Sequence, residues 1–197
     1  MKKKIAAYIL SGGSSSRIGT DKAFLKLGEK KIIEIIIDNL KDVFFDIKIV
    51  SNNPEKYSFL NLVVIDDIYK NYGPLAGIHS ALNDTSAKRN FIISCDMPFV
   101  TKNLLKFIAE YKSSKDIILP QNGKVQTLCG IYSKKCKTKA EKILKDSTVR
   151  NYSIHRLLDI CKPELIDVKT EYEQYNSSLF FNINTKEEYS EIKNLYL

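Results

Sequence analysis

Short apolar segments typical of strands alternate with segments of helical spacing along the whole chain. Such alternation predicts a mostly parallel sheet with helices on both faces, because each crossover between parallel strands needs a covering helix. We therefore expect an α/β fold, a three-layer sandwich. The expected strands are residues 4–10, 46–51, 61–67, 90–96, 115–120, 125–133 and 164–168, and the expected helices are residues 32–43, 73–84, 101–112, 134–146, 151–161 and 184–197.

The length of the chain suits one large domain. It has 197 residues, of which 44% are hydrophobic, and neither a repeat nor a low-complexity linker divides it. We expect a single unit over residues 1–197. The basic and then apolar N-terminus is too short for a signal peptide and runs directly into a glycine loop, so we interpret it as the first strand. No apolar run is long enough to cross a membrane, and the sequence predicts a cytoplasmic protein.

The formal net charge of +8 raises the question of nucleic-acid binding. The lysines are scattered through the chain, however, and arginine occurs at only four positions: Arg17, Arg89, Arg150 and Arg156. A solvated, lysine-rich surface that steers a small polyanionic substrate explains this pattern better than a nucleic-acid interface. We expect neither nucleic acid nor membrane as a partner.

Neither the cysteines nor the histidines show the spacing of a metal or redox motif. The cysteines are expected to be isolated, reduced thiols in and around the core. The histidines are expected to have structural or surface roles. The residues concerned are Cys95, Cys129, Cys136, Cys161, His79 and His155.

A run of small residues at 11–16 directly follows the first strand. Gly12 and Gly13 let the backbone come close to a ligand, and the run contains no carboxylate that would repel an anion. Arg17 and Lys22 follow as two cations suited to phosphate oxygens. The spacing is neither that of a Walker loop nor G-x-G-x-x-G. A nucleoside triphosphate site is the favoured interpretation, and a flexible surface loop is the alternative.

Carboxylates end two of the expected strands. Because ligands of parallel sheets bind beyond the carboxyl ends of strands, these positions are candidates for a site. Asp96 is suited to bind Mg²⁺ together with phosphate oxygens, or alternatively to cap the turn before Pro98. Asp66 and Asp67 are neighbours, and either could contact a nucleotide or cap a turn.

Four motifs together resemble one family. The segment LSGGSSSRIGTDK (10–22) is similar to the L-A-G-G-x-S-x-R-M-G-x-D-K signature of the molybdenum cofactor guanylyltransferases, nucleotidyltransferases with a Rossmann-like sheet. GPLAGIHSAL (73–82), CDMP (95–98) and FNINT (181–185) follow in the family's order, so the resemblance covers nearly the whole chain. Ser11 and Ile18 replace the usual Ala and Met without changing any charge. Thr127 stands where the family often has proline.

The resemblance implies a reaction. The terminal phosphate of molybdopterin, which carries molybdenum, attacks the α-phosphate of GTP, and pyrophosphate leaves. Arg17 and Lys22 would hold the triphosphate as catalytic residues, with Asp96 as the third catalytic residue and the Mg²⁺ ligand. The attacking phosphate is already ionised, so no general base is needed.

The resemblance also assigns binding residues. Residues 1–100 would form the nucleotide-binding part, with contacts from Leu10, Ser11, Gly12, Gly13, Lys22, Ser51, Asn53, Asp67 and Asp96. Residues 101–197 would form the acceptor-binding part, with contacts from Gln126, Asn182 and Asn184. Transient contacts with a molybdenum-insertion enzyme and with molybdoenzyme chaperones are further expectations from the resemblance.

Two other classes of function remain open. The first is another transferase, either a molybdopterin cytidylyltransferase or a sugar-phosphate nucleotidyltransferase. The pair Gly12–Gly13 favours guanine, because cytidine-specific relatives typically have Ala followed by Gly. The second is a non-catalytic module that binds nucleotides or nucleic acid, which the positive charge alone would support.

Overall fold

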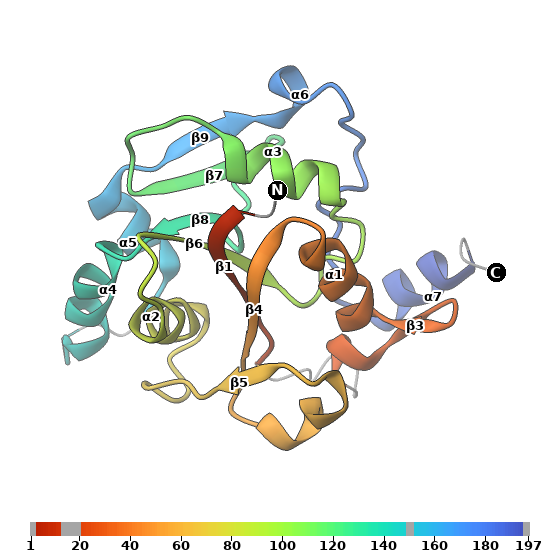
Figure 1. The fold of residues 1–197 in the computed structure, drawn as a ribbon, viewed down its shortest axis with the longest axis horizontal. Coiled ribbons are helices and arrows are strands. Elements are labelled where there is room, and N and C mark those ends of the chain that lie inside the picture. Colours follow the sequence, from red (N-terminus) through yellow and green to blue (C-terminus); the bar gives the residue numbers. More distant parts are fainter. Residues whose placement is uncertain (1–2, 13–20, 149–151, 195–197) are drawn as a thin grey trace.

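The computed structural model describes residues 3–12, 21–148 and 152–194. Within these residues the chain forms a seven-stranded sheet of order β5-β4-β1-β6-β8-β7-β9 (Figure 1). Only β8 runs antiparallel to its neighbours, so the predicted mostly parallel α/β fold is confirmed. The strands are β1 (Lys3–Leu10), β4 (Phe44–Val50), β5 (Val63–Ile65), β6 (Arg89–Ser94), β7 (Ile117–Gln121), β8 (Cys129–Ser133) and β9 (Glu164–Asp167).

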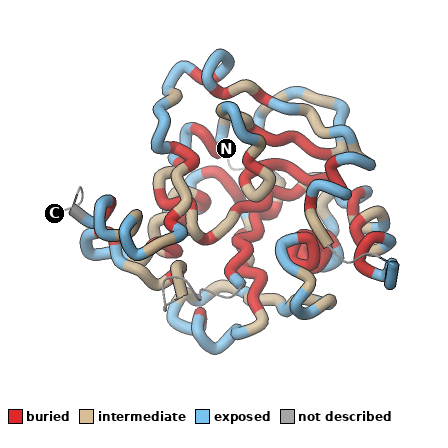
Figure 2. The backbone as a smooth tube through the Cα atoms, turned by 180° about the vertical axis from the view of Figure 1, so that it is seen from behind, coloured by how far each residue is buried: buried red, intermediate tan, exposed pale blue. Residues whose placement is uncertain are grey.

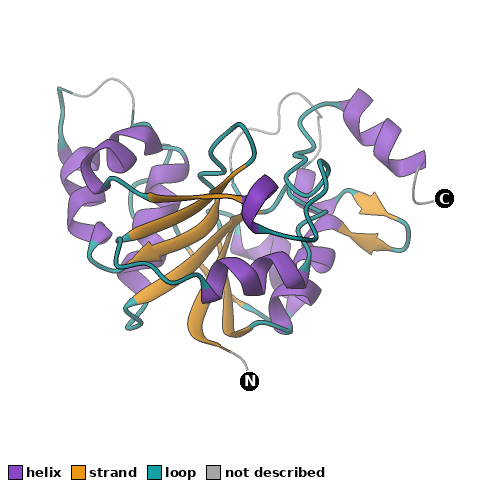
Figure 3. Ribbon diagram, turned by 90° about the horizontal axis from the view of Figure 1, so that it is seen from above, coloured by secondary structure: helices purple, strands orange, loops and turns teal. Residues whose placement is uncertain are grey.

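Helices cover both faces of the sheet and complete the three layers (Figure 3). On one face lie α1 (Ile32–Lys41) and α3 (Lys102–Glu110). On the other lie α2 (Pro74–Asp84), α4 (Cys136–Lys145) and α5 (Ile154–Cys161).

Alternation along β1 shows how the sequence divides the core between these two faces. Ala7 and Ile9 pack in the cluster that includes α1 and α3, whereas Ala6, Tyr8 and Leu10 pack in the cluster that includes α2 and α4. Successive side chains of a strand point to opposite faces, so a strand covered on both sides must be apolar throughout. The buried strands run through the centre of the molecule (Figure 2).

The parallel strands β1, β4, β5 and β6 all end at the same edge of the sheet. Leu10 on β1 pairs with Val50 on β4 and with Ser94 on β6, and Val50 pairs in turn with Ile65 on β5. The segments that follow these four strands therefore start at one edge of the sheet. This edge is where the sequence predicts a ligand.

Several short elements were not expected from the sequence. They are η1 (Lys22–Phe24), the hairpin of β2 (Lys26–Leu27) and β3 (Lys30–Lys31), η2 (Pro54–Leu60) and α6 (Val168–Glu171). The expected strand at 125–133 is shorter in the structure. Residues before Cys129 form a turn, in which the amide of Cys129 donates to the carbonyl of Gln126 over 3.2 Å.

The last helix, α7 (Lys186–Asn194), follows the predicted capping box. The amide of Glu188 donates to Oγ1 of Thr185 over 3.2 Å, and the amide of Thr185 donates back to the Glu188 carboxylate over 3.0 Å. The hydroxyl of Tyr189 donates to the Lys26 carbonyl over 2.8 Å, which ties α7 to the β2–β3 hairpin. Among the described residues, none of the helices has both the length and the apolar character to cross a bilayer.

Substitution of Gly130 tests the close packing of the antiparallel strand β8. A Cβ atom at this position would lie 2.5 Å from the Ile118 carbonyl oxygen and 2.7 Å from Cδ2 of Leu119. Because the carbonyl belongs to the backbone of β7, the strands would have to separate. We expect Gly130→Ala to lower the free energy of unfolding by about 1–3 kcal/mol, measured by urea denaturation. Gly12→Ala is the matched control, since its Cβ would meet none of the described residues within 4 Å.

His79 is buried on α2, as expected for a structural histidine. Within the described residues neither of its ring nitrogens has a hydrogen-bond partner, and its ring packs edge-on against Tyr69 with 5.1 Å between the centroids. Burial lowers the pKa of His79 from its ordinary value, Glu141 opposes this effect, and Lys137 and Lys145 add to it.

The depressed pKa of His79 predicts a loss of stability on acidification. The unfolded chain binds a proton at His79 near pH 6.5, whereas the folded chain binds it only at lower pH. Stability is therefore lost as the pH falls below about 6.5, with a slope of at most ~1.4 kcal/mol per pH unit. The variant His79→Phe lacks this titrating group. Its free energy of unfolding, measured by urea denaturation, should therefore rise relative to that of the wild type when the pH is lowered from about 7.5 to about 5.5. If the free energy of unfolding changes equally with pH in the two proteins, this assignment is wrong.

Candidate functional site

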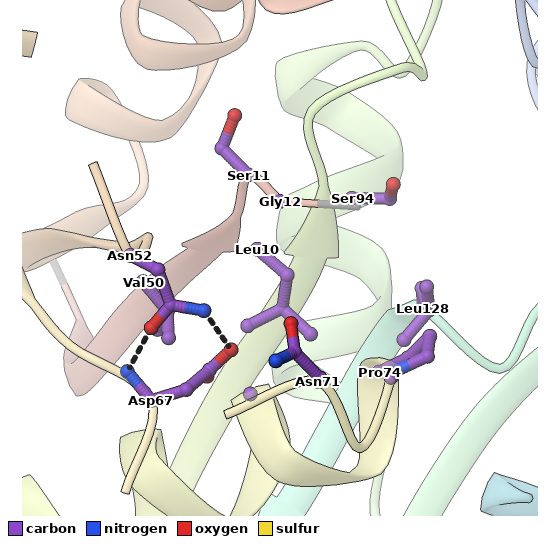
Figure 4. A pocket seen from close by; sticks show the side chains of 12 residues that line it. Leu10, Ser11, Gly12, Val50, Asn52, Asp67, Asn71, Pro74, Ser94 and Leu128 are labelled. Carbon is purple, nitrogen blue, oxygen red and sulfur yellow. Dashed lines mark hydrogen bonds between the residues drawn. The ribbon is translucent and has the colours of Figure 1, made fainter. Parts of the chain in front are cut away.

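An open pocket of about 460 Å³ lies beyond the carboxyl ends of β1, β4 and β6 (Figure 4). The connection after β1 leads through α1 to β4, while α2 leads from β5 to β6 on the opposite face. The pocket therefore lies where the winding of the sheet changes direction, the usual ligand position in such folds. Its lining consists of Leu10, Ser11, Gly12, Val50, Asn52, Asp67, Asn71, Gly73, Pro74, Gly77, Ser94 and Leu128.

Backbone hydrogen bonds fix the segments that leave these strands. The amide of Ser11 donates to the Val50 carbonyl over 3.0 Å, and the amide of Cys95 donates to the Leu10 carbonyl over 3.1 Å. On the far side of β4, the amide of Ser51 donates to the Ile65 carbonyl over 2.9 Å. The sheet is thus extended by one residue into each loop, and the pocket wall is held by the same pattern as the strands.

The beginning of the glycine loop belongs to this wall. Leu10, Ser11 and Gly12 line the pocket, and the Ser11 hydroxyl lies 2.8 Å from the buried hydroxyl of Tyr57. Two other residues of the loop, Gly13 and Arg17, lie outside the described residues.

Asp67 is held in the pocket by Asn52 through two hydrogen bonds, which Figure 4 shows as dashed lines. The Asn52 amide donates to Oδ2 of Asp67 over 3.1 Å, and the Asp67 backbone amide donates to Oδ1 of Asn52 over 3.1 Å. The other oxygen, Oδ1 of Asp67, is buried and has no hydrogen-bond partner among the described residues. Burial raises the pKa of Asp67, and the bond from Asn52 opposes this shift.

Gly77 allows this close arrangement. A Cβ on Gly77 would lie 3.3 Å from both methyl groups of Leu10 and 3.6 Å from Oδ1 of Asp67. Gly77, the second glycine of the GPLAG motif, therefore lets α2 pack closely against Leu10, whereas the contact with the Asp67 carboxylate would be of ordinary length.

The structure distinguishes Asp66 from Asp67. Asp66 is exposed and lies 3.9 Å from the ammonium group of Lys70, outside the pocket lining. Asp67 faces the pocket. Of the two carboxylates that the sequence left open, Asp67 is the one in a position to meet a ligand.

Ser51 and Asn53 do not line the pocket. Ser51 is buried and its hydroxyl accepts a hydrogen bond from the Asn53 amide over 3.3 Å, while the Asn53 side chain is exposed. Asn52 between them is the lining residue, which sequence reasoning missed. The alternation of side chains along β4 could have indicated Asn52, because Val50 and Asn52 are two residues apart and both reach the pocket.

A second cluster joins three predicted site residues from distant parts of the chain. Nζ of Lys22 donates to Oδ1 of Asn184 over 2.8 Å and lies 3.6 Å from Oδ2 of Asp96. Asp21 caps the helix η1 at the Ala23 amide, which positions Lys22 at the first turn. Asp96 follows the pocket residue Ser94 by two positions, so the cluster is continuous with the pocket wall.

The C-terminal segment is tied directly to this cluster. The amide of Ile183 donates to the Asp96 carbonyl over 3.2 Å, and the Asn184 side chain donates to the Asn182 carbonyl over 3.2 Å. Oδ1 of Asn182 is buried without a partner among the described residues, like Oδ1 of Asp67. Two predicted site residues thus each retain a buried acceptor that a ligand could use.

Gln126 lies in the loop between β7 and β8, outside the pocket lining. Its side-chain amide donates to Oδ1 of Asn122 over 2.9 Å and to the Lys124 carbonyl over 3.4 Å. These bonds hold the loop that ends at Leu128, and Leu128 does line the pocket. Gln126 therefore supports this part of the pocket wall without lining the pocket itself.

The donor set at Asp96 is suited to one kind of metal ion. Within the described part of the chain, no three His, Cys, Asp or Glu side chains lie close enough together to hold a metal. A cation at Asp96 would have this carboxylate as a ligand and would take others from a substrate and water. Mg²⁺ commonly binds in this way, through one or two carboxylates and substrate phosphates.

The sequence matches known proteins of one family. Residues 7–160 match the family described as MobA-like NTP transferase domain. A probable molybdenum cofactor guanylyltransferase from Clostridium perfringens is 40% identical, with 98% of this chain and 97% of the relative covered. A protein of the same description from Natranaerobius thermophilus is 36% identical, with 95% and 94% covered.

A solved structure has the same fold. It is the molybdopterin-guanine dinucleotide biosynthesis protein A from Archaeoglobus fulgidus, with a TM-score of 0.80 and 23% identity over 97% of this chain and 98% of that one. The family resemblance inferred from the four motifs is thus confirmed by sequence and by fold. The chain belongs to the MobA-like NTP transferase family.

Proposed function

We propose that this chain transfers GMP from GTP to molybdenum-loaded molybdopterin, giving molybdopterin guanine dinucleotide and pyrophosphate. The names of relatives at 36–40% identity over nearly the full length support this reaction. The observation that carries it is the cluster of Lys22, Asp96 and Asn184 beside the strand-end pocket. A cation, a carboxylate and an amide from three distant segments meet there.

The nucleoside would occupy the pocket. Leu10, Ser11, Gly12 and Asp67 line this space, and Oδ1 of Asp67 is buried without a hydrogen-bond partner among the described residues. Oδ1 of Asp67 would accept a hydrogen bond from an N–H or O–H group of the nucleoside, which removes the cost of leaving a buried acceptor unpaired. Asn52 fixes the direction of this carboxylate.

The triphosphate would extend from the pocket toward Lys22. Lys22 would bind phosphate oxygens together with Arg17, and Asp96 would hold Mg²⁺. When bound, Mg²⁺ neutralises charge that develops on the phosphates. Lys22 would exchange its contact with the Asp96 carboxylate for contacts with phosphate oxygens.

The acceptor would approach from the side of the C-terminal segment. Asn182 and Asn184 would bind the pterin, and Gln126 would act through the shape of the 122–128 loop. The nucleotide-binding part is then residues 1–100, and the acceptor-binding part is residues 101–197. The bond between Lys22 and Asn184 joins the two parts.

Catalysis needs positioning and charge neutralisation more than a protein nucleophile. The molybdopterin phosphate is ionised at neutral pH and would attack the α-phosphate in line, so that pyrophosphate leaves from the side of Lys22 and Arg17. The molybdenum-loaded acceptor would be delivered in the cytoplasm by transient contact with a molybdenum-insertion enzyme. The product would pass to molybdoenzyme chaperones.

Nucleotide binding tests this proposal first. In calorimetry with Mg²⁺ we expect GTP to bind more tightly than CTP, ATP or UTP. Lys22→Ala should weaken GTP binding by about 10–100-fold, because a charge-assisted contact is lost. Asp96→Asn should remove most of the gain in affinity that Mg²⁺ gives. Lys70→Ala is the control, since Lys70 is an exposed cation outside the pocket.

The outcomes separate the candidate functions. Tightest binding of CTP would move the protein to the cytidylyltransferases. A folded protein that binds no nucleotide would overturn the proposal. Strongly salt-dependent binding of RNA or DNA without nucleotide selectivity would favour the non-catalytic module.

Substitution of Asn52 tests the role of Asp67. Asn52→Leu removes both hydrogen bonds that orient the Asp67 carboxylate. We expect GTP affinity in calorimetry to fall by about 5–20-fold, as for the loss of one or two hydrogen bonds to a ligand. Asp66→Asn, one position away from Asp67, should leave the affinity unchanged. Equal affinities of Asn52→Leu and the wild type would show that Asp67 does not contact the nucleotide.

A further inference from the structure

Two cysteines that are distant in sequence lie in contact on the face of the sheet that α2, α4 and α5 cover. Cys136 is the first residue of α4 and Cys161 is the last residue of α5, and their sulfur atoms are 3.8 Å apart. Both are free thiols. The expectation of isolated thiols, which rested on the lack of a close sequence spacing, is therefore wrong for this pair.

The two sulfur atoms have unequal surroundings. Cys136 is buried, and its thiol lies 3.8 Å from the Asp116 carbonyl oxygen, whereas Cys161 is partly exposed. Lys139, one turn after Cys136, lies 3.6 Å from the Asp116 carboxylate. The hydrogen bond from Cys136 and the positive charge of Lys139 lower the pKa of Cys161 to about 7.

The other two cysteines differ from this pair. Cys95 and Cys129 are buried, and burial raises the pKa of each to about 12. A thiolate is the reactive form of cysteine, so these two remain inert at neutral pH. A partly exposed cysteine beside a cation, with a second thiol in contact, is the arrangement of a redox-sensitive pair.

We propose that Cys136 and Cys161 form a reversible intramolecular disulfide when a hydroperoxide reaches Cys161. The proposed reaction makes no use of this pair, which lies on α4 and α5, two helices that contribute no lining residue to the nucleotide pocket.

The chemistry has two steps. The Cys161 thiolate attacks one peroxide oxygen, the O–O bond breaks, and the sulfur becomes a sulfenic acid while hydroxide or alkoxide leaves. The Cys136 thiol then attacks the Cys161 sulfur, an S–S bond forms, and the sulfenic hydroxyl leaves as water with the Cys136 proton. Two thiols are oxidised and one peroxide is reduced. The sulfur atoms must approach from 3.8 Å to about 2.05 Å, a small movement at the ends of two helices.

Thiol counting and mass spectrometry on the full chain test the proposal. After hydrogen peroxide at pH 7.5, the unfolded protein should show two free thiols instead of four, and its mass should fall by about 2 Da through loss of two hydrogens. A peptide linked through Cys136 and Cys161 should appear, and dithiothreitol should restore four thiols. The bridge closes a long loop, so we expect the Tm to rise by roughly 5–10 °C.

Variants assign the role of each residue. In Cys136→Ser the reaction should stop at a sulfenic acid on Cys161, which dimedone traps. Lys139→Met should slow oxidation at pH 7.5 roughly tenfold, because less Cys161 is ionised. Cys129→Ala is the control and should form the bridge as the wild type does.

Three results would overturn the proposal. They are four remaining thiols after peroxide, a sulfinic acid on Cys161 without a bridge, or a disulfide between two molecules. None of these measurements depends on nucleotide binding, so this test and the test of the proposed reaction fail independently.

Discussion

The site depends on the register of three neighbouring parallel strands. Leu10, the last residue of β1, pairs with Val50 at the end of β4 on one side and with Ser94 at the end of β6 on the other. Because three parallel strands end at the same height, the residues that follow them are gathered at one edge although they are distant in sequence. The backbone bonds from Ser11 to Val50 and from Cys95 to Leu10 continue this pairing into the loops. The apolar layers on both faces hold the register, since a slip of one residue would exchange the two cores.

The antiparallel strand β8 explains how the second half of the chain reaches the same edge. It pairs with β6 on one side and β7 on the other, and the amide of Ser94 donates to the Leu128 carbonyl over 2.9 Å just before β8 begins. Leu128 thereby becomes part of the pocket wall. Gly130 allows β7 to lie close against β8, where a side chain would meet the backbone.

Much of this arrangement follows from the sequence, for identifiable physical reasons. The alternation of strands and helices predicts the sheet, and a carboxylate at a strand end predicts the positions of Asp67 and Asp96. The capping box at Thr185 predicts the start of the last helix. These features depend on neighbours in the sequence, so local patterns are enough to find them.

The remaining features depend on contacts between distant segments. The alternation from Val50 points to Asn52 only if the strand conformation continues past Val50, and it is the bond from the Ser51 amide to the Ile65 carbonyl of β5 that continues it. Gln126 belongs to a turn that shortens the expected strand at 125–133. Cys136 and Cys161 meet because α4 and α5 pack together, and no sequence spacing records this contact.

The polar groups of the site contribute little to the stability of the fold, and on the proposed function they would meet a ligand. Lys22 and Asp96 lie 3.6 Å apart with about a fifth of each side chain exposed, and in such a mostly buried ion pair the cost of desolvation offsets much of the Coulombic attraction. The buried Oδ1 atoms of Asp67 and Asn182 have no hydrogen-bond partner among the described residues, and a buried acceptor that stays unpaired costs about 1–3 kcal/mol. On the proposed reaction, Lys22 would meet phosphate, Asp96 would meet a cation, and both oxygens would accept hydrogen bonds from the two substrates. Asn52 already holds the Asp67 carboxylate in direction and Asn184 holds Lys22, so little ordering of these two side chains remains to oppose binding.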